Sequence, residues 1–254
     1  LRRMSRLLAL ALIWLACTAA APVKLITDIS QSRIDIIYTF KGAELLVFGA
    51  IQYANGQVPD EPPGLAVVMR GPAEPVTVRK KARVAGIWVN TRSARFESAP
   101  GFYAVATSKP IAKLVDQRTA TIWEIGVDSL QLSPTGNATP AETGEFEHGL
   151  IDLRRRNGLF AEHEGAVGIS QNILYRARIA IPSSVPVGSY TAQIFLIKNG
   201  EVIAQSTSPI EIDKSGFERW VFVAAHNHSL AYGLAAVAAA LLAGWGAGLV
   251  VRRT

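Results

Sequence analysis

The sequence predicts a mainly β chain: immunoglobulin-like antiparallel sandwiches, one or two in number, with a short helical insertion and one C-terminal transmembrane helix. Three observations predict this fold class. Short runs rich in Val, Ile, Tyr and Phe recur at a spacing of about ten residues. Turns rich in proline and glycine separate these runs. A long stretch without any charge lies near the end of the chain, at 229–251.

The strands are expected in two regions, 22–108 and 161–213. In the first region, later apolar runs predict strands at Leu65–Met69, Val76–Arg79, Val84–Val89 and Phe102–Thr107. In the second region, the turn 185–188 directly precedes a strand that begins near Tyr190, an order that is typical of immunoglobulin-like sandwiches. Asn199-Gly200 predicts a hairpin turn between the last two strands.

Residues 109–160 are expected to form a helical and loop insertion. Pro110 is typical of a helix start. Further on, Phe146 and Leu150 share one face of an amphipathic helix that would end before Gly158. The arginine triplet near the end of this helix is interpreted as a solvated helix terminus rather than an anion site.

The N-terminus predicts export. Three arginines precede the apolar run 7–16, and small residues follow it, which is the order of a secretory signal peptide. The run is too short to cross a bilayer, which requires about twenty residues. We expect cleavage after Ala20 or Ala21, so that residues 1–21 are removed. Cys17 is the only cysteine, and its removal would leave a mature protein without disulfides.

The C-terminus predicts a membrane anchor. At about 1.5 Å per residue the uncharged stretch 229–251 would reach roughly 34 Å, enough for a hydrocarbon core of about 30 Å. Arg252 and Arg253 follow directly, and arginines favour the cytoplasmic side. We therefore expect a chain that is exported and then anchored once by its tail, with everything between outside.

Two features of this anchor region raise further possibilities. His226 and His228 lie directly before it, but two histidines need further ligands to hold a metal, so we interpret them as polar residues at the headgroup level. Within the predicted helix, small residues recur every four positions. Gly244 and Gly248 give the closest approach for a neighbouring helix, which predicts self-association or packing against another membrane protein.

Candidate catalytic residues are few. Glu145, His148 and Asp152 would lie on one helix face, and Glu-x-x-His is a helical metal-ligand spacing. No second copy of the motif occurs, because the carboxylates beside His163 have a different spacing. The stretch 168–172 lacks the final glycine of a G-x-S-x-G nucleophile motif. We therefore predict no catalytic, cofactor-binding or metal-ligating residues, and no cofactor.

The net charge of +6 is carried largely by arginines at the two termini. The segment 22–228 is close to neutral, so we expect no nucleic-acid partner. The expected partners are the lipid bilayer and another membrane or periplasmic protein.

Three long segments, Phe40–Ile51, Ile181–Ile203 and Lys214–Thr254, resemble the alphaproteobacterial putative transmembrane protein family. The resemblance covers nearly the whole mature chain. It implies a Gram-negative inner-membrane protein with a periplasmic domain, and it implies no activity.

These expectations lead to a single-pass inner-membrane protein whose periplasmic β-rich domain is a binding or assembly module for another envelope protein. The alternative is a membrane-tethered periplasmic hydrolase or metal-handling enzyme. The predicted order along the chain is signal peptide 1–21, β-sandwich region 22–108, helical and loop insertion 109–160, second β region 161–213, juxtamembrane segment 214–228, transmembrane helix 229–251 and cytoplasmic tail 252–254.

Overall fold

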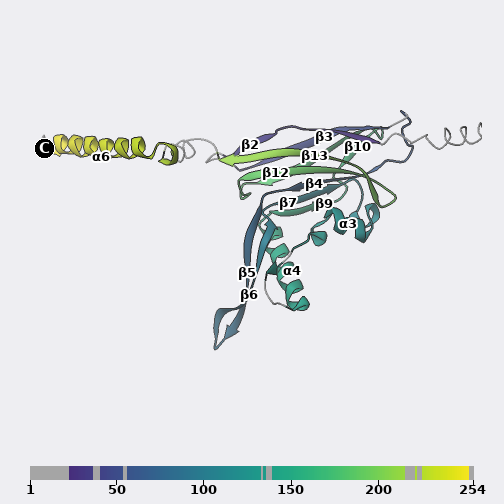
Figure 1. The fold of residues 1–254 in the computed structure, drawn as a ribbon, viewed down its shortest axis with the longest axis horizontal. Coiled ribbons are helices and arrows are strands. Elements are labelled where there is room, and N and C mark those ends of the chain that lie inside the picture. The colour runs from purple at the N-terminus through teal and green to yellow at the C-terminus, as the bar shows by residue number, and fades with distance from the viewer. Residues whose placement is uncertain are drawn as a thin grey trace, which may run out of the picture.

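The computed structural model describes residues 23–36, 41–53, 56–132, 134–135, 139–214, 221 and 225–251. Within them the chain is mainly β, as the sequence predicts, and its strands form three sheets (Figure 1). The predicted signal peptide 1–21 and the predicted cytoplasmic tail 252–254 lie outside the described residues.

The first sheet has four strands in the order β1-β3-β11-β10, all antiparallel to their neighbours. The second has six, in the order β2-β13-β12-β4-β7-β9. The strands of the first sheet are β1 (Lys24–Ile29), β3 (Gly42–Gln52), β11 (Leu174–Pro182) and β10 (Gly168–Ser170). Those of the second sheet are β2 (Arg33–Ile36), β13 (Glu201–Lys214), β12 (Gly188–Lys198), β4 (Gly64–Arg70), β7 (Tyr103–Thr107) and β9 (Phe160–His163).

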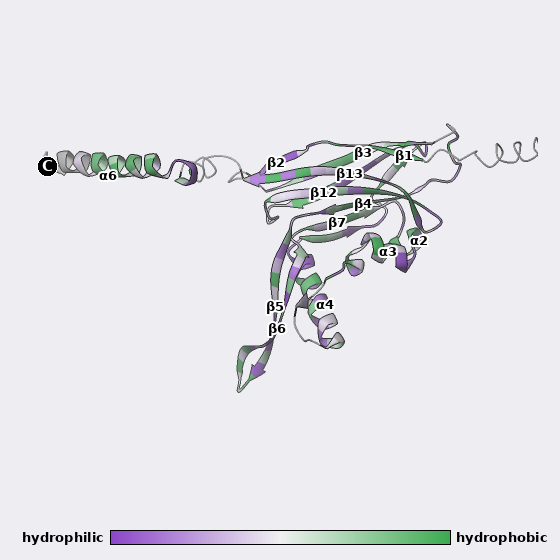
Figure 2. Ribbon diagram, viewed as in Figure 1, coloured by the Kyte–Doolittle hydropathy of each residue, from purple (hydrophilic) through white to green (hydrophobic). Residues whose placement is uncertain are grey.

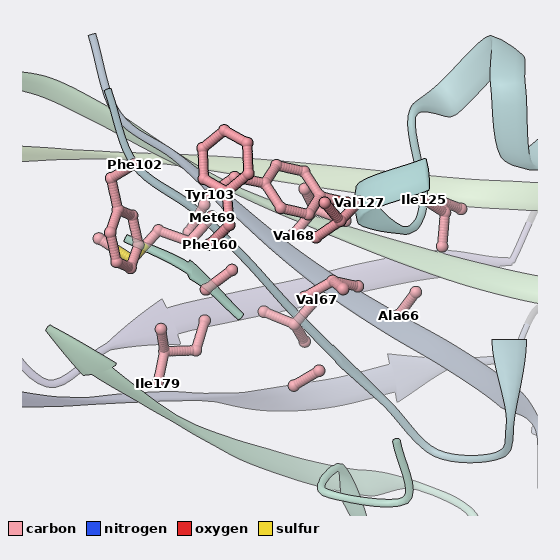
Figure 3. Close-up of a cluster of buried hydrophobic side chains, with 14 of the residues drawn as sticks. Ala66, Val67, Val68, Met69, Phe102, Tyr103, Ile125, Val127, Phe160 and Ile179 are labelled. Carbon is pink, nitrogen blue, oxygen red and sulfur yellow. The ribbon is translucent and has the colours of Figure 1, made fainter. Parts of the chain in front are cut away.

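The centre of the second sheet is buried on both faces. β4 and β7 are almost wholly buried, as continuous apolar runs such as LAVVM require. On one side they meet the first sheet, from which Ile179 of β11 joins the same cluster (Figure 3). On the other side lie α2 (Ile111–Leu114), α3 (Gln117–Trp123) and η1 (Val127–Ser129). The rings of Trp123 and Phe195, whose centroids are 5.4 Å apart, join α3 to β12.

The expectation of purely antiparallel, immunoglobulin-like sandwiches is wrong. β2 pairs with β13 in parallel, and β9 pairs with β7 in parallel. The physical reason in the second case is the crossover: between β7 and β9 the chain passes through the helices of the insertion, including α4 (Pro140–Arg156), and returns in the same direction. The six-stranded sheet is therefore mixed.

Two local predictions in this region are confirmed. Asn199 and Gly200 both have positive φ, 53° and 84°, and join β12 to β13 in an antiparallel hairpin. Tyr190, buried near the start of β12, donates a hydrogen bond of 2.6 Å to the carbonyl oxygen of Pro186 in the preceding turn. The parallel strand β9, which follows the helical insertion, departs from an antiparallel immunoglobulin-like sandwich.

The third sheet is a long antiparallel hairpin, β5 (Ala73–Val84) and β6 (Ile87–Pro100), with the short β8 (Pro134–Thr135) beside β6. Figure 1 shows this hairpin leaving the two larger sheets, with α4 next to its base. We call residues 73–100 the arm. The single strand expected at Val84–Val89 is wrong, because Ala85 and Gly86 have positive φ and form the turn at the tip.

The predicted transmembrane helix needs a correction. The helix α6 (Ser229–Val251) carries mostly hydrophobic residues (Figure 2). Among the described residues, no helix is both long enough and apolar enough to cross a membrane. The prediction is therefore wrong for the part of the chain that the structure describes, and the association through Gly244 and Gly248 stays untested.

Candidate functional site

The largest hollow that we find among the described residues is a groove of about 630 Å³ at one end of the second sheet. Three parts of the chain form it: the 53–64 connection between β3 and β4, α2 with the residues before it, and the β12–β13 turn. Its lining residues are Val23, Tyr53, Pro59, Asp60, Glu61, Pro62, Pro63, Gly64, Lys109, Lys113, Leu114, Leu196, Ile197, Lys198, Asn199, Gly200 and Ile203. We call this hollow the groove.

The wall that the β3–β4 connection supplies is fixed by hydrogen bonds. The side-chain amide of Asn172 donates to the carbonyl oxygens of Pro59 and Asp60, at 2.8 and 3.1 Å. The hydroxyl of Tyr53 donates to the carbonyl oxygen of Asn172 at 2.7 Å. Burial raises the pKa of Tyr53, so its hydroxyl stays protonated as a donor at neutral pH. A connection held in this way, and stiffened by prolines, is a preformed surface.

The groove has an apolar surface with three lysines around it, and the carboxylates of Asp60 and Glu61 lie on its β3–β4 side. Ile203 of β13 is 44% exposed, a large value for an isoleucine on a strand. Lys113 and Lys198 are exposed, and no ion pair joins either of them to a carboxylate within the described part of the chain. Lys109 donates to the carbonyl oxygen of Pro62 at 3.4 Å. Exposed apolar area beside unpaired positive charge is typical of a surface that binds a partially acidic ligand.

Of the residues considered for catalysis, Glu145 and Asp152 line a common hollow between α4 and the arm, and the two histidines, His148 and His163, are not among its lining residues. Glu145 is paired with Lys80 of the arm, and His148 is exposed on α4. His163 lies on β9 and is exposed as well. Within the described ranges, no group of three or more His, Cys, Asp or Glu side chains could hold a metal ion. His226 and His228 are exposed directly before α6.

The arginine triplet at the end of α4 has a structural role in the fold. Arg154, whose side chain is only 13% exposed, pairs with Glu74 at the base of the arm. Arg155 lies 3.0 Å from Glu162 and 3.7 Å from Asp128. Because carboxylates of this chain already occupy these two guanidinium groups, they do not offer an anion site to a ligand.

Sequence reasoning missed the groove because its residues come from segments that are far apart in the chain. The one local signal was the proline-rich run VPDEPPG at 58–64, which was interpreted only as a connection between strands. Nothing in that run indicates that α2 and the β12–β13 turn lie opposite it.

The geometry defines a β-rich body that offers a preformed groove. The chain belongs to the family described as putative transmembrane protein, which it matches over residues 24–253. The resemblance inferred from the sequence is thus confirmed, and the chain is a member of a membrane-protein family.

The chain is similar to the sporulation control protein Spo0M from Bacillus subtilis, with 10% sequence identity and a TM-score of 0.30. The similarity covers 82% of this chain and 56% of that chain, so this chain spans about half the length of Spo0M. No curated protein matches the sequence.

Proposed function

We propose that the protein is a periplasmic binding module at the inner membrane, which holds a segment of another envelope protein in the groove. The observation that carries this proposal is the groove itself: a preformed apolar hollow bordered by two lysines without carboxylate partners. Its volume of about 630 Å³ is in the range of sites that bury a ligand or a short peptide segment.

The chemistry of the groove defines its ligand. Ile203 and the prolines would cover apolar side chains of the bound segment, and removal of this area from water supplies affinity. Lys113 and Lys198 would pair with one or two acidic side chains, which supplies orientation and partner choice. The segment that fits is therefore apolar with acidic residues beside the apolar ones.

Two features of the sequence support a location in the periplasm. The charge, apolar run and small residues at the N-terminus have the order of an export signal, and the chain contains one cysteine, which lies inside that signal. The alternative of a tethered hydrolase or metal-handling enzyme has no support from converging side chains in the described residues.

Replacing Ile203 with arginine tests the groove. The full chain, with an affinity tag, would be purified from solubilised membranes of its own host, and the co-purifying proteins would be quantified. We expect the principal partner to fall by about tenfold or more, because the substitution places an unpaired charge in the apolar part of the groove.

The matched control is Ile26→Arg, which changes an equally exposed isoleucine on β1 (53% exposed against 44%) that does not line the groove. The control should keep the partner. Equal recovery of the same proteins with Ile203→Arg and with the unaltered chain would contradict the proposal.

A further inference from the structure

We propose that the tip of the arm inserts into the surface of an anionic membrane. The arm is separate from the groove, and this inference does not depend on what the groove binds. It rests on the charge of the arm, on the exposed apolar side chains at its tip, and on the way α4 holds its base.

The charge of the arm is one-sided. Between Val76 and Phe96 the sequence contains six basic residues and no acidic residue. They are Arg79, Lys80, Lys81, Arg83, Arg92 and Arg95. The whole arm, 73–100, also contains Glu74 and Glu97 near its base, so its formal net charge is +4. An element of this composition is attracted to anionic lipid, at about 1 kcal/mol for each basic residue near the surface.

One face of the arm packs against α4, and two of the six cations lie on that face. Val78, Ala94 and Phe96 are buried on the face that α4 covers. On this same face Lys80 pairs with Glu145 of α4, and Arg92 pairs with Glu142 of α4 at 2.6 Å.

The other cations of β5 alternate with these positions and point away from α4, because successive residues of a strand face opposite sides. Arg79, Lys81 and Arg83 are all exposed, and no ion pair joins them to a carboxylate within the described residues. The guanidinium of Arg83 donates to the carbonyl oxygen of Gly86 in the turn at the tip. α4 thus neutralises Lys80 and Arg92, and Arg95 pairs with Glu97 of its own strand, whereas Arg79, Lys81 and Arg83 have no carboxylate partner among the described residues.

The tip is apolar and uncovered. Val84, Ile87 and Trp88 are 51%, 65% and 69% exposed, and only Ala85 and Gly86 lie between them. Figure 2 shows the arm ending in free space, away from the rest of the body. Exposure of adjacent large apolar side chains at the end of a projecting hairpin is unfavourable in water and indicates a surface that is buried in use.

The order of residues along the arm fits a bilayer surface. Trp88 pairs with Arg83 across the two strands, and Lys81 and Arg79 follow towards the base, at intervals of about 7 Å. Tryptophan prefers the boundary between headgroups and acyl chains. Apolar side chains that enter by about 5–10 Å would therefore place Arg83 and Lys81 near the level of the lipid phosphates, with Arg79 about 7 Å further out. The chain belongs to a family described as putative transmembrane protein, which favours lipid as the occupant of this surface.

A fluorescent label at the tip tests the inference. The full chain would carry Cys17→Ser and Ile87→Cys, with an environment-sensitive fluorophore on the new thiol, and would be reconstituted with vesicles. With vesicles rich in phosphatidylglycerol we expect the emission to shift to the blue, and a lipid-borne doxyl quencher to reduce it. With pure phosphatidylcholine both effects should be much weaker. Added salt should weaken them too, because it screens the attraction.

Matched variants distinguish attraction between the arm and anionic lipid from non-specific binding of the protein to vesicles. Changing Arg79, Lys81 and Arg83 together to glutamine should reduce the lipid-bound fraction of the tip roughly a hundredfold, about fivefold for each residue. The control changes Lys24, Lys41 and Arg118 to glutamine, which removes the same charge from exposed positions outside the arm and should have little effect. A label at Ser183→Cys, also exposed, should stay in water.

Three outcomes would overturn the inference. The label at position 87 could remain unquenched with phosphatidylglycerol vesicles. The two triple variants could bind equally. Shielding of the label could also require an added membrane-protein extract, which would make the tip a docking site for a protein rather than for lipid.

Discussion

Replacing Tyr103 with alanine is expected to lower the free energy of unfolding by about 4 kcal/mol, the largest effect of any single substitution considered for this fold. The side chain is fully buried in β7, at the centre of the second sheet. Its ring meets the edge of Phe160 with centroids 6.1 Å apart. Removing the ring leaves a large cavity in the buried cluster to which Tyr103 and Phe160 belong (Figure 3).

The hydroxyl of Tyr103 adds a second contribution. It donates a hydrogen bond of 2.7 Å to the carbonyl oxygen of Glu124 and accepts one of 2.9 Å from the backbone amide of Gly126. Burial raises the pKa of Tyr103, so the hydroxyl remains a donor over the whole physiological range. These bonds hold the α3–η1 segment on the sheet.

Tyr103→Phe separates the two contributions. This variant keeps the ring and should lower the free energy of unfolding by about 1–2 kcal/mol, because it leaves the buried amide of Gly126 without its partner. Urea denaturation of the purified variants would give both values. If Tyr103→Ala and Tyr103→Phe lowered the free energy of unfolding by the same amount, the packing account of this cluster would be wrong.

The second large effect is expected at Gly49 in β3. A Cβ atom at this position would lie 2.1 Å from the carbonyl oxygen of Ile26 on β1 and 2.6 Å from the hydroxyl of Tyr175. Because one of these atoms belongs to the backbone of a paired strand, relief requires β1 to move away from β3. We expect Gly49→Ala to lower the free energy of unfolding by about 2–3 kcal/mol.

Gly168→Ala in β10 is the control for this prediction. It makes the same substitution in the same sheet, but the nearest atom to the new Cβ would be 3.6 Å away, an ordinary contact. Its effect should be within about 1 kcal/mol and can be stabilising, because alanine restricts the unfolded chain more than glycine does. Equal melting temperatures for the two variants would show that β1 does not lie where the structure places it.

The sequence predicted the β-rich character of the chain because that information is local. Runs such as LAVVM and the Asn199-Gly200 turn carry their own signals, since side-chain shape and backbone freedom act over a few residues. The same locality explains the error at Val84–Val89. The run VAGIWV is apolar on both sides of the turn, so a hairpin tip resembles one strand unless the positive φ values of Ala85 and Gly86 are known.

The remaining features depend on contacts between distant segments. The parallel pairing of β7 with β9 follows from the path of the insertion, which no repeat or spacing in the sequence specifies. The groove requires the 58–64 run to face α2 and β13. The division of the cations of the arm into paired and free sets requires α4 to cover one face, which places Glu145 beside Lys80 although they are 65 residues apart.

The most direct test of the proposed binding function is site-specific photocrosslinking in living cells. A photoreactive phenylalanine analogue would replace Ile203 in the groove and, in a separate strain, Ile26 on β1. The account predicts an adduct with one envelope protein from position 203 and none from position 26, and reversal of Lys113 and Lys198 to glutamate should weaken that adduct. No adduct from position 203, or the same adducts from both positions, would contradict it.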